Sequence, residues 1–230
     1  MLKQIVLVLL IVMNLLGKEE NLHLFTIENV RYDYTATANS LNDTQISYNL
    51  PSLNYVFLNS KYIALASFKY SPKQHIGNTA FGTTNIDFEQ KGRKYELGAG
   101  YKHYLTEDLY IGPALLFSDS HSTLYQVINN NVTKTEKYDS DLRAYLIMGL
   151  NLTHSTMLFY SVELKNDLLS NDYAKDYSQY NTSVTLYQFI SSQSFLYLKY
   201  EQALRDKNIQ NNISGNEHYK GYGAGVGINF

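Results

Sequence analysis

The last ten residues of the chain, 221–230, alternate between two kinds of side chain at every step. One set is apolar or aromatic and consists of Tyr222, Ala224, Val226, Ile228 and Phe230. The other set consists of four glycines and Asn229. Successive side chains of a β-strand point to opposite faces, so a period of two predicts a strand. This strand would have one apolar face and one face of small or polar residues.

The same alternation continues through most of the chain, and helical periodicity is weak. We predict ten strands, over approximately residues 22–36, 43–57, 61–73, 84–104, 108–128, 132–153, 156–167, 177–190, 194–204 and 217–230. Eight or twelve strands are also compatible with the pattern. Pro51 and Pro113 fall inside two of these segments. Because proline cannot donate to a strand ladder, we expect a β-bulge at each of them.

Short and long connections alternate between the predicted strands. The short ones are 59–60, 105–107, 154–155 and 191–193, and the longer ones are 37–42, 73–83, 168–176 and 205–216. An even number of antiparallel strands closed into an up-and-down barrel requires this alternation. The compact connection Asn129–Asn131 joins two segments of about twenty residues, whereas a membrane crossing needs about ten. We expect these two strands to continue past the membrane as a β-hairpin.

The strand faces predict which side chains point into the barrel. In the segment 132–153, Leu146 and Leu150 share an apolar face, and Arg143 and Tyr145 lie on the other face. Charged residues with the inward phase are Glu96, Lys102, Arg143, Glu163, Lys165, Lys199 and Glu201. The interior of a small barrel is filled by side chains, and buried charges must pair. These seven residues therefore predict an ion-pair network that plugs the lumen. A narrow polar pore is the alternative, because inward glycines leave space beside the charges.

Composition excludes several classes of function. The chain has no cysteine, which excludes disulfides and cysteine-based metal or redox sites. Its 19 basic and 21 acidic residues form no basic stripe that would indicate nucleic-acid binding. Twenty-two tyrosines and no tryptophan fit strands whose ends lie at membrane–water interfaces.

The first residues predict a secretory signal peptide. Lys3 precedes an apolar run from Ile5 to Met13, and Gly17 is followed by the charged Lys18. The run is too short for a transmembrane helix, which needs about 20 apolar residues. We expect residues 1–17 to be the signal peptide and residues 18–230 to be the barrel.

The histidines do not predict catalysis. His121 and Ser122 are adjacent in a predicted strand and therefore point to opposite faces, so they cannot form a nucleophile–base pair. The spacing of the histidines is unlike that of a metal site. We expect no enzyme activity, no metal and no cofactor.

Taken together, the signal peptide, the alternating strands, the terminal strand ending in Phe230 and the turn-like segment Tyr104–Tyr110 resemble small bacterial outer-membrane β-barrels of the OmpA membrane-domain, OmpX and OmpW types. The resemblance implies an outer-membrane location with the termini and short turns in the periplasm. It implies contacts with outer-membrane lipid and lipopolysaccharide, and recognition of the terminal strand by the barrel assembly machinery. The implied role is structural or surface-interacting. A small-solute channel is second, and an enzyme acting on lipid A or peptides is third.

Overall fold

The computed structural model describes residues 21–38, 41–81, 84–165, 177–209 and 213–229. The predicted signal peptide and Phe230 lie outside these residues. None of the described residues belongs to a helix long and apolar enough to cross a membrane.

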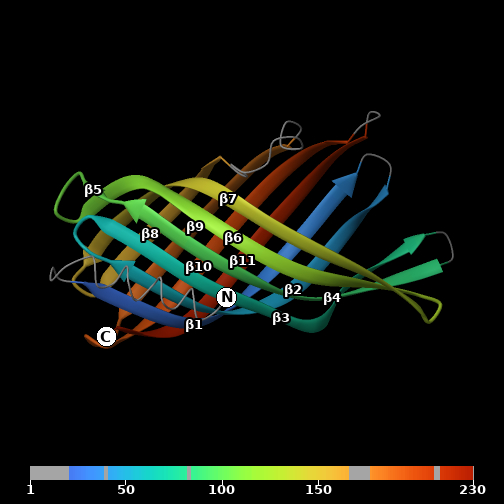
Figure 1. The fold of residues 1–230 in the computed structure, drawn as a ribbon, viewed down its shortest axis with the longest axis horizontal. Helices are drawn as coiled ribbons and strands as arrows, with labels where there is room; N and C mark the ends of the chain where they lie inside the picture. Colours follow the sequence, from blue (N-terminus) through green and yellow to red (C-terminus); the bar gives the residue numbers. More distant parts are fainter. Residues whose placement is uncertain (1–20, 39–40, 82–83, 166–176, 210–212, 230) are drawn as a thin grey trace.

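Every regular element in the described part of the chain is a β-strand (Figure 1). The strands are β1 (Leu22–Ala38), β2 (Leu41–Leu58), β3 (Tyr62–Phe81), β4 (Thr84–Tyr101), β5 (His103–Tyr104), β6 (Leu109–Ile128), β7 (Asn131–Thr153), β8 (Thr156–Lys165), β9 (Tyr177–Phe189), β10 (Ser194–Ile209) and β11 (Ile213–Asn229). The two residues of β5 continue β4, since both elements pair with β6. All pairings are antiparallel, and β1 pairs with β11. The prediction of a closed, up-and-down barrel of ten strands is confirmed.

The barrel has two different ends. One end, here the turn end, carries the tight connections β2–β3, β5–β6, β7–β8 and β9–β10 together with the start of β1 and the finish of β11. The other end, here the loop end, carries the remaining connections. A side-chain turn closes β2–β3: Oδ1 of Asn59 accepts hydrogen bonds from the backbone N–H groups of Lys61 (2.9 Å) and Tyr62 (2.7 Å).

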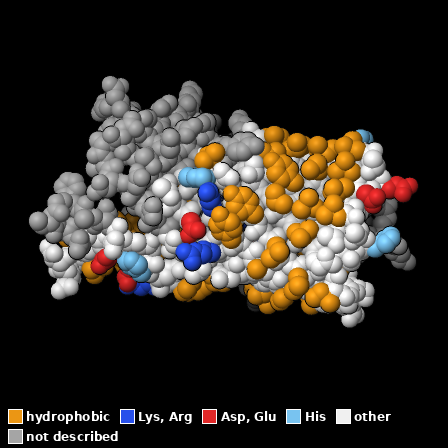
Figure 2. Space-filling view, turned by 180° about the vertical axis from the view of Figure 1, so that it is seen from behind, with side chains coloured by type: hydrophobic (Ala, Val, Ile, Leu, Met, Phe, Trp, Pro, Cys, Tyr) orange, Lys and Arg blue, Asp and Glu red, His pale blue; other side chains and the backbone are white. Residues whose placement is uncertain are grey.

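The outer surface is apolar over the part of the barrel nearer the turn end. Figure 2 shows this band, with charged side chains gathered at its margin toward the loop end. The exposed apolar residues include Ile27, Leu53, Leu115, Leu152, Leu164, Leu198, Val226 and Ile228. Arg143 and Ile147 are buried, so the predicted inward face of β7 is confirmed. A band of this kind faces lipid in transmembrane barrels.

The two prolines are accommodated differently. Pro113 of β6 pairs with Leu146 of β7 and lies opposite the break between β4 and β5. The register is the same on both sides of this break, so the bulge predicted at Pro113 was wrong, and the ladder is only interrupted there. The backbone of Tyr101 lies very close to Gly112 at this point. A Cβ added at Gly112 would lie 1.7 Å from the carbonyl oxygen of Tyr101. No bulge exists at Pro51, so that prediction was wrong. Pro51 is the first residue of β2 beyond the ladder with β3, so that ladder needs no donor from it.

Strands β2 and β3 diverge toward the loop end. Their ladder runs only from Leu58↔Ile63 to Ser52↔Lys69, whereas β2 stays paired with β1 as far as Leu41 (Figure 1). The side chain of Gln74 spans the gap. Its Nε2 donates to the carbonyl oxygen of Asn49 (2.9 Å), and its Oε1 accepts from the Asn49 N–H (3.2 Å). One amide side chain thus replaces a backbone bridge at the point where the sheet opens.

Strands β6 and β7 form the longest hairpin of the fold. Their ladder is continuous from Leu109↔Leu150 to Ile128↔Asn131. Asn129 and Asn130 have φ values of 48° and 67°, the left-handed conformation that a two-residue type I′ turn requires. Residues 131–140 are all exposed. The predicted hairpin extension is confirmed, and residues 119–140 are called the arm below.

Candidate functional site

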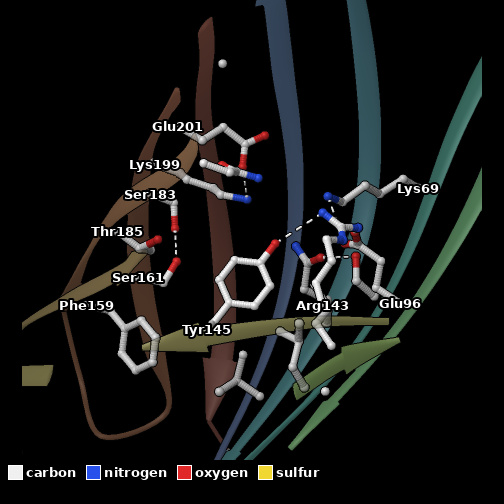
Figure 3. Close-up of a pocket in the computed structure, with 18 of the residues that line it drawn as sticks. Lys69, Glu96, Arg143, Tyr145, Phe159, Ser161, Ser183, Thr185, Lys199 and Glu201 are labelled. Carbon is white, nitrogen blue, oxygen red and sulfur yellow. Dashed lines mark hydrogen bonds and ion pairs between the residues drawn. The ribbon is translucent and has the colours of Figure 1, made fainter. Parts of the chain in front are cut away.

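A chamber of about 740 Å³ lies inside the barrel (Figure 3). The residues that line it come from all around the barrel. Toward the loop end they include Tyr48, Asp139 and Gln202, and toward the turn end they include Leu58 and Met157. Most of the buried charged side chains lie along its wall.

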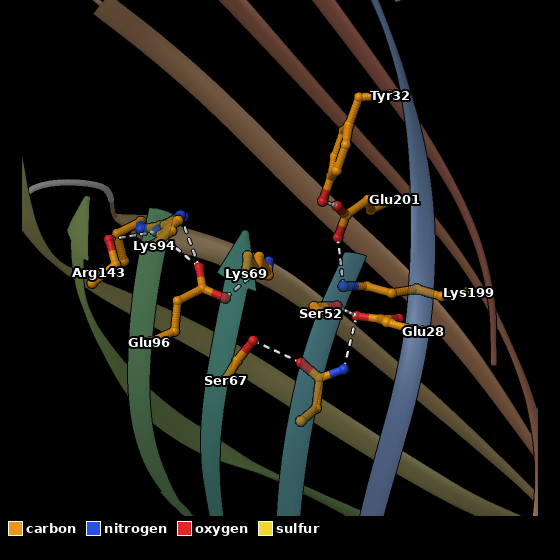
Figure 4. Close-up of polar contacts among 12 residues, drawn as sticks. Glu28, Tyr32, Ser52, Ser67, Lys69, Lys94, Glu96, Arg143, Lys199 and Glu201 are labelled. Atoms are coloured by element: carbon orange, nitrogen blue, oxygen red, sulfur yellow. Dashed lines mark hydrogen bonds and ion pairs between the residues drawn. The ribbon is translucent and has the colours of Figure 1, made fainter. Parts of the chain in front are cut away.

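Three cations surround the buried carboxylate of Glu96 (Figure 4). The Nζ of Lys69 is 2.9 Å from one carboxylate oxygen, and the Nζ of Lys94 is 2.8 Å from the other. The Nη2 of Arg143 is 3.7 Å from the same oxygen as Lys94. These four residues on β3, β4 and β7 are called the Glu96 cluster. It joins β4 to its neighbour β3 and, across β6, to β7.

Arg143 links the Glu96 cluster to further groups. Its Nε is 3.1 Å from Asp141, its Nη2 donates to Ser118 (3.1 Å), and its Nη1 donates to the hydroxyl of Tyr145 (3.1 Å). The Tyr145 hydroxyl in turn donates to Glu163 (3.3 Å). Both Tyr145 and Arg143 therefore tie β7 to its neighbours through the interior.

A second group of charges lies on β1 and β10 (Figure 4). The Nζ of Lys199 is 2.7 Å from Glu201, whose carboxylate also accepts a hydrogen bond from the Tyr32 hydroxyl. Glu28 accepts hydrogen bonds from Ser52 (2.6 Å), Asn54 (2.8 Å) and Tyr197. These residues are called the Lys199 cluster. The hydroxyl of Ser67 donates to Asn54 (2.6 Å) and so brings β3 into contact with this cluster.

The glycine-rich face of β11 makes room for these side chains. A Cβ at Gly221 would lie 2.7 Å from Cγ of Glu201 and 3.0 Å from the ring of Tyr32. A Cβ at Gly227 would lie 2.1 Å from the ring of Phe195. The inward glycines of the last strand thus leave the space that large side chains of β1 and β10 occupy.

An apolar layer lies between the charged clusters and the turn end. It consists of the buried residues Leu24, Val56, Leu58, Ile63, Ile147, Met157, Tyr187, Phe195 and Tyr197. These residues are called the closure layer. Below it is a recess of about 500 Å³, and the two hollows share only Leu58 and Met157 among their lining residues. The alternating pattern of the sequence predicted charges as the plug and did not predict this layer.

The recess at the turn end holds a buried lysine. Lys102 is 5% exposed, and its Nζ donates to the hydroxyl of Tyr104 (3.1 Å). The Nζ also lies 4.8 Å from the ring centroid of Tyr110 and 5.3 Å from that of Tyr104. No carboxylate of the described residues forms an ion pair with it.

The structure distributes the seven predicted lumen charges over several places. It brings Glu96 together with Arg143, and Lys199 together with Glu201, while Glu163 reaches Arg143 only through Tyr145. Lys102 lies apart from them in the recess. The side chain of Lys165 lies outside the part that the structure describes.

Sequence reasoning missed three charged residues of the clusters, namely Glu28, Lys69 and Lys94. A signal for each was present. Lys69 lies on the same, inward face of its strand as Ile63, and Lys94 lies on the same face of its strand as Glu96. Glu28 has the phase of Leu24 and Thr26, both of which are buried. Extending the face assignment to every strand would have found all three.

The candidate catalytic residues do not assemble. The ring of His121 stacks on Tyr138 with centroids 4.2 Å apart, and Asp119 accepts a hydrogen bond from Ser140 (2.7 Å). Nearby on the arm, the hydrogen bond from Lys134 lowers the pKa of the Glu136 carboxyl. In the described residues no three histidine or acidic side chains gather as a metal site would require.

Known proteins resemble this chain in structure but not in sequence. No model of a protein family and no curated protein matches the sequence. Among solved structures, the outer-membrane protease OmpT of Escherichia coli matches with a TM-score of 0.57 and 8% identity, over 93% of this chain and 98% of the other. The closed barrel, its apolar outer band and this match lead to one conclusion.

The chain has the fold of the bacterial outer-membrane β-barrels. Two further structures resemble it less well. The translocator domain of the autotransporter NalP from Neisseria meningitidis has a TM-score of 0.43 and 8% identity, over 93% of this chain and 91% of the other. Ail of Yersinia pestis, in complex with the heparin analogue sucrose octasulfate, has a TM-score of 0.38 and 10% identity, over 90% and 99%. At 8% identity, the likeness to OmpT concerns the fold and not its activity.

Proposed function

We propose that this outer-membrane barrel does not conduct and has a structural or surface-interaction role. The turn end would face the periplasm and the loop end the cell surface. The observation that carries the proposal is the closure layer, whose packed apolar side chains lie at the level where the chamber and the recess share only Leu58 and Met157 as lining residues. An ion that crossed it would lose its hydration without gaining polar partners.

The charged clusters would complete the closure. Each buried ion pair is stable only while its partners stay in place, and removal of one partner leaves a desolvated charge. The Glu96 cluster and the Lys199 cluster connect β1, β3, β4, β7 and β10 across the interior. We propose that they fix the shape of the barrel and narrow the lumen above the closure layer.

The arm supports the surface-interaction part of the proposal. It continues the β6–β7 ladder beyond the apolar outer residues Phe117 and Leu142, and its strand β7 is exposed along residues 131–140. In this charged extension β6 stays paired with β4 as far as Ile128, whereas the other edge of β7 has no ladder before Ala144 among the described residues. Such an exposed strand suits contact with another surface more than transport through the barrel.

Contact with lipopolysaccharide fits the margin of the apolar band. Arg31, Arg93 and Lys220 are exposed and have the outward phase on β1, β4 and β11. They lie next to outward aromatic residues such as Tyr222. Figure 2 shows basic side chains at this margin on one face. Phosphate groups of lipopolysaccharide would meet these cations at the membrane surface.

Conductance in a planar lipid bilayer tests the closed lumen. The purified barrel, with folding verified by its heat-modifiable migration on a gel, is expected to give no stable channel currents. A general porin inserted under the same conditions serves as the positive control. Stable, ion-selective currents from the folded barrel would favour the small-solute channel and contradict the closed lumen.

A further inference from the structure

The recess at the turn end has the chemistry of a binding site for an anion. We infer that it binds a small carboxylate with an apolar tail, which enters from the turn end. The carboxylate would lie at Lys102 and Tyr110, and the tail against the lower face of the closure layer. This inference does not depend on whether the lumen conducts.

Lys102 supplies a positive charge with which no carboxylate of the described residues forms an ion pair. It is buried, and its Nζ uses one of three donor positions on the Tyr104 hydroxyl. The rings of Tyr104 and Tyr110 lie beside it, and aromatic faces stabilise an ammonium group only in part. A buried charge without a counter-ion is costly, so a bound anion would relieve that cost.

Tyr110 gives a second, independent indication of a ligand. Its side chain is 4% exposed, and its hydroxyl has no hydrogen-bond partner among the described residues. The ring is held where it is because it packs over Gly149, where a Cβ would lie 2.1 Å from the ring. A buried hydroxyl normally has a partner, so this one is available to a ligand in the recess that it lines.

The rest of the lining fits an anion with an apolar body. None of the nine lining residues is acidic, and they are Leu22, Leu58, Asn59, Ser60, Lys102, Tyr104, Tyr110, Asn151 and Met157. Asn59 uses its Oδ1 in the β2–β3 turn, which leaves its NH₂ donor for a ligand. Leu22, Leu58 and Met157 form the apolar part. The recess volume of about 500 Å³ lies in the range of small-molecule sites.

Calorimetric titration of the folded barrel in zwitterionic micelles tests the inference. The probes are hexanoate, hexanol as the same tail without charge, and inorganic phosphate as a charge without a tail. The variants are K102Q, which removes the charge, and Y110F, which removes only the hydroxyl. K61Q is the matched control, because Lys61 is an exposed lysine of the neighbouring turn.

We expect saturable binding of hexanoate to the wild type, with hexanol and phosphate binding at least tenfold more weakly. K102Q should weaken hexanoate binding tenfold or more, Y110F several-fold, and K61Q not at all. Equal binding of hexanol and hexanoate by the wild type would overturn the inference without any variant. If phosphate bound as tightly as hexanoate, the proposed contribution of the apolar tail to binding would be wrong. Unchanged affinity in a correctly folded K102Q would overturn the role of Lys102.

Discussion

At the scale of single residues, the surroundings of each buried charge decide how much it matters. Glu96 has three cations within 4 Å, and both of its oxygens are paired. Glu163 is also buried, yet one of its oxygens has no hydrogen-bond partner in the described residues. The two carboxylates look equivalent in the sequence, since both are inward-facing glutamates in alternating strands. Their energetic roles differ because only one of them has cations in direct contact.

The substitution Glu96→Gln should therefore destabilise the barrel strongly. It leaves Lys69, Lys94 and Arg143 close together without their shared carboxylate, and breaking a buried pair typically costs about 3–5 kcal/mol. Reversible unfolding by urea in lipid vesicles would measure the change. The control is Glu136→Gln on the exposed arm, where no measurable change is expected because exposed ion pairs contribute little.

Glu163→Gln provides a comparison inside the barrel. It removes no direct ion pair, so its effect should be clearly smaller than that of Glu96→Gln. Equal losses of stability at positions 96 and 163 would mean that the clusters act as one network in which direct contacts do not matter.

At the scale of elements, alternation predicts strands well and predicts their pairing limits poorly. The expected segment 108–128 became β6 (Leu109–Ile128), because its side chains alternate between the two faces of the sheet. The divergence of β2 from β3 beyond Pro51 was not predictable from that pattern. A strand keeps its alternating side chains whether one or both of its edges are paired, so the pattern contains no information about where a ladder ends.

The arm should be removable without loss of the barrel. Ser120 pairs with Asp139, as Ile128 pairs with Asn131 next to the native turn. The two pairs are an even number of residues apart along each strand. Replacing residues 121–138 by Asn-Gly therefore keeps the ladder phase and supplies a type I′ turn. The shortened protein should fold with normal heat-modifiable migration and lose contacts made at the cell surface, as measured by binding of whole cells to a cell monolayer. Failure of the shortened protein to fold would show that the arm is part of the barrel's stability.

The final strand is expected to act in assembly. Tyr222, Val226 and Ile228 are exposed on the outer face of β11, where the assembly machinery could read them. Deletion of Phe230, which lies outside the described residues, should reduce the amount of protein inserted in the outer membrane of living cells. Refolding of the purified protein into detergent should remain normal. Normal insertion in cells after this deletion would contradict the role as an assembly signal.

At the scale of the whole molecule, the closed barrel determines which inward residues meet. Strand phase predicts that Glu96 and Lys102 both face the lumen, and both are buried. They nevertheless lie at different positions along the barrel axis, because Glu96 lines the chamber and Lys102 lines the recess. Height depends on strand tilt and on the stagger of the closed sheet, which a single strand's sequence does not encode. The sequence therefore predicted that charges line the interior and could not predict the apolar layer between them.

Widening the closure layer should convert the barrel into a channel. Leu58 and Met157 belong to that layer and line both the chamber and the recess, so Leu58→Ala together with Met157→Ala would join the two hollows. Each truncation costs about 2–5 kcal/mol, so conductance is measured only on protein that shows heat-modifiable migration. Leu65→Ala with Leu116→Ala is the control, because these residues line only the chamber. Currents are expected from the first pair and not from the control. If neither the double variant nor the control gave currents, the lumen would be closed at the charged clusters. If both gave currents, any loss of packing would make the barrel leak.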